Sequence, residues 1–167
     1  MGRVFFNTRQ NTHVLDANDA TYQCLASDSN KLFLLDTNTA LAITLPADAD
    51  IEIGWNARFA MVSDHANTAI TIKCSDKTDS TGQLMIGGLD VQMTAVAAAS
   101  VFQGYATAAV ASNISQIALD HDLDDNQAAV GTDFTITKTA ANRFFVSGKF
   151  VSVDADGDGS AIFSNIS

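Results

Sequence analysis

Hydrophobic and polar residues alternate along most of this chain with a period of two. In residues 41–45 (LAITL) large apolar side chains alternate with small or polar ones, and in residues 134–139 (FTITKT) every second residue is threonine. Successive side chains of a β-strand point to opposite faces, so this period is typical of half-buried strands. The pattern therefore predicts strands along most of the chain.

The stretch between residues 21 and 46 shows how these strands are organised. Its sequence (TYQCLASDSN, KLFLLDTNTA, LAITLP) predicts three short strands separated by two turns and closed by Pro46, the single proline. Similar stretches follow at residues 59–62, 69–74 and 143–153. Strands that recur about every 8 to 12 residues are typical of a β-sandwich or barrel. We therefore expect an all-β fold, and we identify no internal repeat of roughly 20 to 50 residues.

The alanine-rich residues 95–112 (AVAAASVFQGYATAAVAS) are the one ambiguous segment. Alanine favours a helix, but Gly104 and the β-branched Val96, Val101 and Val110 disfavour one. We predict strands with small side chains here, and a helix is the alternative.

The length of the chain bounds its domain organisation. With 167 residues and 47% hydrophobic residues, it can bury one core but not two independent ones. We expect an N-terminal arm or first strand over residues 1–19 and a single β-sandwich domain over residues 20–167. The N-terminal residues do not resemble a signal peptide and no apolar run is long enough to span a bilayer. We therefore expect synthesis in a cytoplasm and no membrane partner.

The charged residues exclude one class of partner. The chain has 18 aspartates and a single glutamate, Glu52, and its formal net charge is −10 at pH 7. Aspartate favours turns, whereas glutamate, lysine and arginine favour helix interiors, so this composition also disfavours helices. Because a strongly acidic protein repels phosphate groups, we expect no nucleic-acid partner.

The two cysteines and three histidines form no recognisable reactive site. Cys24 and Cys74 lie in separate strand-like segments without a CxxC spacing, so we predict buried thiols, with a disulfide only if their strands are neighbours. His13, His65 and His121 are far apart, and no nucleophile motif accompanies them. We therefore place the histidines in turns and expect no enzyme activity and no cofactor.

One segment resembles part of a calcium-binding loop. Asp154, Asp156 and Asp158 alternate with small residues and precede Gly159. Alternating carboxylates can surround Ca²⁺, but the twelfth position is Asn165 rather than a bidentate glutamate. We predict a glycine-rich hairpin turn, with these three aspartates as a weak calcium candidate.

The serial order of several motifs carries a family resemblance. The motifs are Tyr22-x-Cys24-x-Ala26-x-Asp28-Ser29, Lys31-x-Phe33-x-Leu35, Ile43-Thr44-Leu45-Pro46, Arg58-Phe59-Ala60-Met61-Val62, Ile70-Thr71-Ile72, Val130-Gly131-x-x-Phe134-Thr135-Ile136 and Asn142-Arg143-Phe144-Phe145-Val146-x-Gly148. In this order they resemble the β-rich modules of tailed-bacteriophage virion proteins, notably head decoration (cement) proteins and small tail-fibre modules. The chain departs from them at Phe144 or Phe145, where such modules often have tryptophan.

The resemblance implies a jelly-roll or β-sandwich homotrimer that binds by shape. It implies a structural virion protein on the capsid surface, made in the host cytoplasm, whose partner is the major capsid protein. Our hypothesis for the contact with the capsid or a neighbouring protomer is the basic, aromatic arm, and an ordinary first strand is its alternative. The arm residues concerned are Arg3, Val4, Phe5, Phe6 and Arg9.

Two other functions stay open from the sequence. One is a tail-fibre or adaptor module that binds host glycans, for which Trp55, just before a predicted strand, could be an exposed platform. The other is a cell-envelope hydrolase, which requires two acidic side chains that converge in a cleft.

Overall fold

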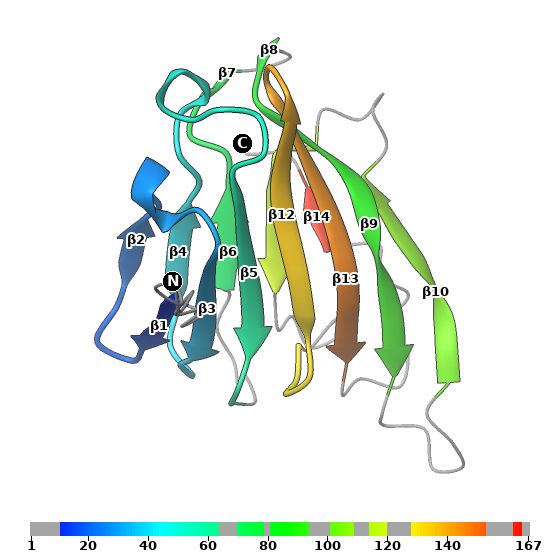
Figure 1. The fold of residues 1–167 in the computed structure, drawn as a ribbon. Helices are drawn as coiled ribbons and strands as arrows, with labels where there is room; N and C mark the ends of the chain where they lie inside the picture. The colour runs from blue at the N-terminus through cyan, green and yellow to red at the C-terminus, as the bar shows by residue number, and fades with distance from the viewer. Residues whose placement is uncertain are drawn as a thin grey trace, which may run out of the picture.

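The computed structural model describes residues 11–63, 70–78, 81–93, 101–108, 114–119, 128–152 and 162–164. Two main sheets and one small hairpin make up this part of the chain, which contains no α-helix, so the predicted all-β class is confirmed. In Figure 1 the five-stranded sheet lies behind the seven-stranded one.

The strands of the seven-stranded sheet, in spatial order, are β1 (Asn11–Asp16), β3 (Lys31–Asp36), β5 (Asn56–Met61), β12 (Asp133–Ala140), β13 (Arg143–Ser152), β9 (Leu84–Met93) and β10 (Val101–Ala108). Those of the five-stranded sheet are β14 (Phe163–Ser164), β11 (Gln116–Leu119), β6 (Ile70–Lys73), β4 (Leu41–Thr44) and β2 (Thr21–Gln23). The hairpin pairs β7 (Lys77–Thr78) with β8 (Thr81–Gly82), and two 3-10 helices are η1 (Ala26–Asp28) and η2 (Asp48–Asp50).

The three strands expected between residues 21 and 46 are confirmed as β2, β3 and β4. The strand expected within residues 95–112 is confirmed for β10. The sandwich expected from the spacing is present as two sheets that share one buried core. A jelly roll is not confirmed, because the pairs β1–β3, β3–β5, β2–β4 and β4–β6 are parallel, whereas jelly rolls are antiparallel.

The first six strands form three stacked rungs. The chain alternates between the two sheets, so that β1, β3 and β5 lie side by side in one sheet and β2, β4 and β6 in the other. Asn11 lies beside Lys31, and Lys31 lies beside Ala57, so one rung takes 20 residues and the next takes 26. Because the step varies, the stack leaves no fixed repeat in the sequence.

A row of rings runs through the core along these rungs. His13, Phe33, Phe59 and Phe134 are neighbours in the register of four adjacent strands, and the ring centroids of successive pairs lie 5.8, 5.1 and 5.6 Å apart. Stacked and tilted aromatic pairs at these distances stabilise a core beyond the area they bury. His13 was expected in a turn, which is wrong: it lies in β1, where its ring fits the inward-facing row.

The predicted buried thiols are confirmed. Cys24 and Cys74 are both buried, and neither is part of a disulfide. Cys24 N donates to Thr44 O, and the next residue of that strand, Leu45, donates to Lys73 O. The β4 segment therefore separates the two cysteines, and a disulfide would need directly neighbouring strands. Burial raises the pKa of the Cys24 thiol to about 12, which keeps it protonated at neutral pH.

Several predictions fall on residues that lie outside the described ranges. These are the arm residues Arg3, Val4, Phe5, Phe6 and Arg9, the calcium candidates Asp154, Asp156 and Asp158, and the histidines His65 and His121. Residues 11–16 of the expected arm or first strand form β1, and the division into residues 1–19 and 20–167 stays a prediction.

Candidate functional site

A hollow lies at one end of the stack, where the chain passes through η1 and η2. It consists of two adjoining depressions of about 250 Å³ and about 600 Å³ that share Ala26 and Asp50. We call both together the end hollow. Its lining residues are Gln23, Cys24, Leu25, Ala26, Ser29, Pro46, Ala47, Asp50, Ile51, Glu52, Trp55 and Ser75.

Hydrogen bonds fix the walls of the end hollow. Trp55, which lines the smaller depression, donates from Nε1 to the carbonyl oxygen of Leu25 at 3.2 Å. Gln23 donates from Nε2 to the carbonyl oxygen of Leu45, also at 3.2 Å. These bonds join the end of β2 and the segment that follows it to the segment between β4 and β5, so the hollow is formed in advance of any ligand.

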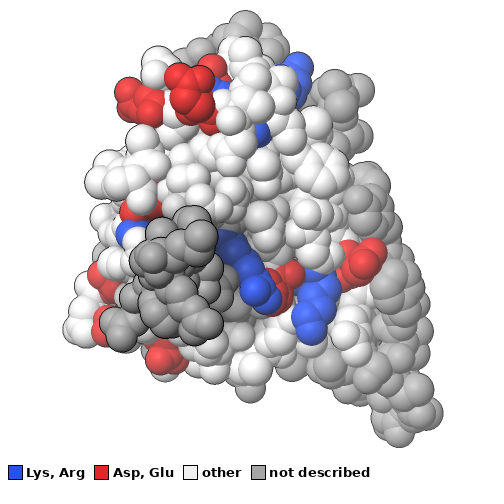
Figure 2. Space-filling model, viewed as in Figure 1, with Lys and Arg blue, Asp and Glu red and all other residues white. Residues whose placement is uncertain are grey.

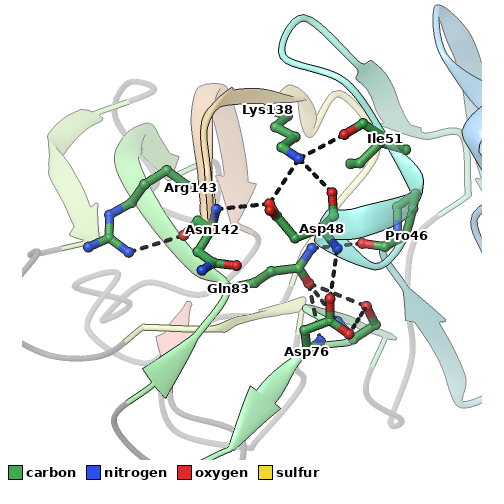
Figure 3. Close-up of polar contacts among 9 residues, drawn as sticks. Pro46, Asp48, Ile51, Asp76, Gln83, Lys138, Asn142 and Arg143 are labelled. Carbon is green, nitrogen blue, oxygen red and sulfur yellow. Dashed lines mark hydrogen bonds and ion pairs between the residues drawn. The ribbon is translucent and has the colours of Figure 1, made fainter.

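At the same end of the molecule, a buried lysine binds η2 and the residue that follows it. Lys138 is only 5% exposed, and its Nζ donates to the carbonyl oxygens of Asp48 at 2.7 Å and Ile51 at 2.8 Å. The same Nζ lies 2.9 Å from the Asp48 carboxylate, which also accepts from the backbone N–H of Asn142 (Figure 3). Burial opposes ionisation of Asp48, but these hydrogen bonds and the lysine charge hold its pKa below the ordinary value.

Gln83 extends this network to the third rung. Its Nε2 donates to the carbonyl oxygen of Pro46 at 2.8 Å, and its Oε1 accepts from the backbone N–H groups of Ser75 and Asp76. The carboxylate of Asp76 in turn accepts from the backbone N–H of Asp48 at 2.7 Å. Lys138, Asp48, Gln83, Asp76 and Asn142 together form what we call the polar clamp (Figure 3).

The two acidic residues of the end hollow differ from three other carboxylates in the described part of the chain. Asp50 and Glu52 are exposed and make no ion pair within the described part of the chain. Asp28, Asp48 and Asp133 each pair with a lysine or arginine. The hollow therefore combines a mostly apolar floor with uncompensated negative charge on its rim.

A buried carboxylate fixes η1 to β2 and β3 by hydrogen bonds. Asp28 is 2% exposed and accepts from Lys31 Nζ at 2.5 Å, from the Leu25 backbone N–H at 2.9 Å and from the Tyr22 hydroxyl at 3.1 Å. Burial alone would raise the pKa of Asp28, but the bonds from Lys31, Leu25 and Tyr22 lower it below 3.8. Burial and the neighbouring Asp28 charge raise the pKa of Tyr22 to about 12.

The outer face of the seven-stranded sheet carries a row of alternating charges. Arg58 of β5 makes a bidentate ion pair with Asp133 of β12, and Asp133 lies in register with Lys149 of β13. Lys149 in turn lies in register with Asp90 of β9. Figure 2 shows blue and red side chains alternating across this face. We call these four residues the charge row.

Small polar and apolar side chains border the charge row. Thr135 and Ser147 lie in register with each other beside it, and their side chains are small. Toward β1, the exposed Val14 lies in register with the half-buried Leu34 of β3. The face therefore offers a neutral set of charges next to an apolar strip, an arrangement suited to contact with another surface.

Trp55 lies immediately before β5, as expected, but it is not an exposed platform. Only 4% of its surface is exposed, because its indole packs in the core near Phe144, with ring centroids 6.1 Å apart. The prediction that Trp55 is exposed is therefore wrong. Its buried ring cannot serve as the platform on which a sugar would stack.

The polar clamp was not anticipated, although one sequence signal points to it. Phe134, Ile136 and Lys138 occupy alternate positions of one strand, and all three are buried. A lysine at the third inward position of an alternating strand must find acceptors inside the molecule. The acceptors on Asp48 and Ile51 could not be found in this way, because only the fold brings η2 next to β12.

Stability is expected to fall at both ends of the pH scale. Asp28, Asp48 and Asp133 have lowered pKa values in the folded state, so the unfolded chain takes up more protons as the pH falls through about 4, and stability is lost there. Cys24 ionises in the unfolded chain near its ordinary value of 9.0 but keeps its proton to about 12 when folded, so stability declines above pH 9.

Urea unfolding between pH 3 and pH 11 measures this profile. Cys24→Ala removes the thiol, so the alkaline decline of the variant should begin nearer pH 10, where Tyr22 ionises in the unfolded chain. An alkaline limb identical in wild type and variant would contradict the assignment to Cys24.

The described residues place further limits on the chemistry. No group of three or more His, Cys, Asp or Glu side chains gathers among them in a way that could hold a metal ion. No helix in the described ranges is long and apolar enough to cross a membrane. Comparison with known proteins gives no relative: no protein-family model, no curated protein and no solved structure matches the chain.

Proposed function

We propose that this protein is a structural virion protein of a tailed bacteriophage that decorates the outside of the capsid shell and stabilises it. The proposed partner is the major capsid protein and the proposed assembly is a homotrimer, both following the resemblance of the sequence motifs. A symmetric oligomer on a shell multiplies contacts that are each weak, which is how such a protein would resist internal pressure.

The observation that carries the proposal is the outer face of the seven-stranded sheet. Its charge row has no net charge, although the whole chain carries −10. A neutral charge row bordered by small polar and apolar side chains approaches another protein surface with less repulsion than the acidic remainder of the molecule. The rigid two-sheet core behind it favours binding by shape.

A catalytic function has weaker support. The buried carboxylate of Asp28 and the partly buried carboxylate of Asp48 are held by lysines in structural bonds. Asp50 and Glu52 both line the end hollow, as a hydrolase with paired acids requires, but both are exposed. A general acid of that class needs a desolvated carboxyl group. Hydrolysis of a cell-envelope preparation by the purified protein would nevertheless favour this alternative.

Copy number in purified particles tests the proposed location. On the order of hundreds of copies per particle supports capsid decoration, since a decoration protein follows the symmetry of the shell. A few copies to a few dozen would support the tail-fibre or adaptor alternative. Absence from every particle would contradict both.

An exchange of charges tests the docking face. In Arg58→Asp/Asp133→Arg the intramolecular ion pair can re-form, so the free energy of unfolding should stay within about 1 kcal/mol of wild type. The charge row, however, changes from alternating to two adjacent positive charges between two negative ones. We expect roughly tenfold lower occupancy of the variant on particles lacking the protein, because mismatched charges weaken association.

The matched control for this exchange is Asp36→Asn, which removes an exposed carboxylate at the end of β3, away from the charge row. It should bind particles as wild type does. Full occupancy by the exchanged variant would show that this face does not contact the shell.

A further inference from the structure

We infer that the end hollow is a binding site for a lysine or arginine side chain that a partner protein presents on an extended, apolar segment. The inference rests on the proposed function, because it assigns to the partner of this structural protein the chemistry of its contacting segment. It depends on the shape, the wall contacts and the charges of the hollow.

The shape of the hollow fits a short piece of extended chain. Its two depressions adjoin at Ala26 and Asp50, and each is large enough for a side chain. The smaller one is lined by Ile51, Glu52 and Trp55, and the larger one by apolar residues that include Leu25 and Pro46. One side chain in each depression therefore requires a ligand with at least two neighbouring side chains.

The walls are fixed before a ligand arrives. Trp55 is bonded to Leu25, Lys138 holds the carbonyl of Ile51, and Gln83 holds the carbonyl of Pro46. Each of these bonds joins a lining residue to a different segment of the chain. A hollow held in this way loses little conformational entropy on binding, which favours even a small ligand.

The charges select a cation. Within the described part of the chain, Asp50 and Glu52 have no ion-pair partner and no lysine or arginine lines the hollow. An anionic ligand would be repelled. A compact metal ion would find only these two carboxylates, fewer oxygen ligands than calcium requires. A cation on an apolar stem can pair with the carboxylates of Asp50 and Glu52 and pack its stem against the apolar lining of the hollow.

Lysine and arginine have this construction. Their methylene stems can lie along Ile51 and Trp55 while the charged end reaches the carboxylates. Leu25, which lines the larger depression, is 56% exposed, and Ile53, next to Glu52 in the chain, is 68% exposed. Apolar residues on either side of the cation would cover them, so the segment is both basic and apolar.

Capped tripeptides test this assignment on the full chain. The probes are acetyl-Leu-Arg-Leu-amide, its lysine analogue, and the glutamine and glutamate analogues as controls. Trp55 is the only tryptophan and lines the hollow, so its fluorescence reports occupancy directly. We expect saturable binding of the arginine and lysine peptides, weakened by salt, and at least tenfold weaker binding of the glutamine peptide. Equal binding of the arginine and glutamine peptides would overturn the inference.

A variant pair locates the site. Asp50→Asn/Glu52→Gln should lower the affinity for the arginine peptide about tenfold or more, since it removes both charges and keeps the side-chain shapes. Asp36→Asn and Asp90→Asn, which remove exposed carboxylates elsewhere, should leave the affinity unchanged. A loss of the same size in these controls would mean that net charge alone attracts the peptide, and would overturn the site.

Other occupants give distinguishable results. If the chain's own Arg3 or Arg9 filled the hollow, Arg3→Gln/Arg9→Gln would bind the arginine peptide more tightly than wild type. If a metal ion filled it, millimolar calcium chloride would displace the peptide, whereas equal ionic strength of sodium chloride would not. Either result overturns the assignment to a partner segment.

The same variants separate this inference from the proposed function. Wild-type protein that coats particles but does not bind the arginine peptide would leave capsid decoration standing and remove the ligand. Peptide binding that Asp50→Asn/Glu52→Gln abolishes, together with absence of the protein from particles, would do the reverse.

Discussion

Gly87→Ala is expected to destabilise the protein by about 4 kcal/mol, whereas Gly54→Ala should cost only about 1 kcal/mol. The two glycines have nearly the same backbone conformation, with φ of +101° and +100°. This region disfavours any residue with a Cβ atom, so both variants carry the same conformational cost. Their surroundings differ: a Cβ on Gly87 would lie 2.2 Å from the carbonyl oxygen of Val146, and a Cβ on Gly54 has no atom within 4 Å.

The comparison isolates the effect of the close contact between β9 and β13. Gly87 and Val146 are register partners in this parallel pair, so relief of the overlap requires the two strands to separate locally. Both variants also lose the same chain entropy in the unfolded state, and this contribution cancels in the comparison. Urea unfolding at neutral pH measures the two free energies. Equal losses would show that β9 and β13 can move apart without cost.

The sequence predicts the strands of this fold but not their arrangement. An alternation of period two shows which side chains share a face, and it located β2, β3 and β4 between residues 21 and 46. It does not show whether neighbouring strands are parallel or antiparallel, because both present the same alternation. The stacked rungs could therefore not be predicted from the alternation. Because one rung takes 20 residues and the next takes 26, the sequence also shows no fixed repeat.

The end hollow was even harder to predict from the sequence than the arrangement of the strands. The end hollow draws its walls from residues 23–29, 46–55 and Ser75, which only the stacking of rungs brings together. Trp55 appeared to be a surface residue because it precedes a strand, yet its indole N–H is satisfied by Leu25, and the ring is buried. Position along the chain did not reveal this contact, which crosses from one rung to another.

Lys138→Met is the second large effect that we expect, a loss of about 3 to 5 kcal/mol of unfolding free energy. The lysine is buried, and its removal leaves the carbonyl oxygens of Asp48 and Ile51 without this donor and the Asp48 carboxylate without its ion-pair partner. Methionine has nearly the same length and adds no cavity, so the loss reports the unsatisfied polar groups rather than packing. Lys149→Met, at an exposed position of the charge row, is the control and should change stability by less than about 1 kcal/mol.

A double-mutant cycle with Asp48→Asn shows which acceptors matter. If the ion pair dominates, Lys138→Met should cost much less in the Asp48→Asn background, because asparagine leaves no unpaired charge behind. If the two carbonyl oxygens dominate, the cost should be nearly the same in both backgrounds. In either case the Ile51 wall of the end hollow loses its support, so the affinity for acetyl-Leu-Arg-Leu-amide should fall in Lys138→Met and stay at the wild-type value in Lys149→Met. A Lys138→Met protein as stable as wild type would contradict the clamp as a source of stability.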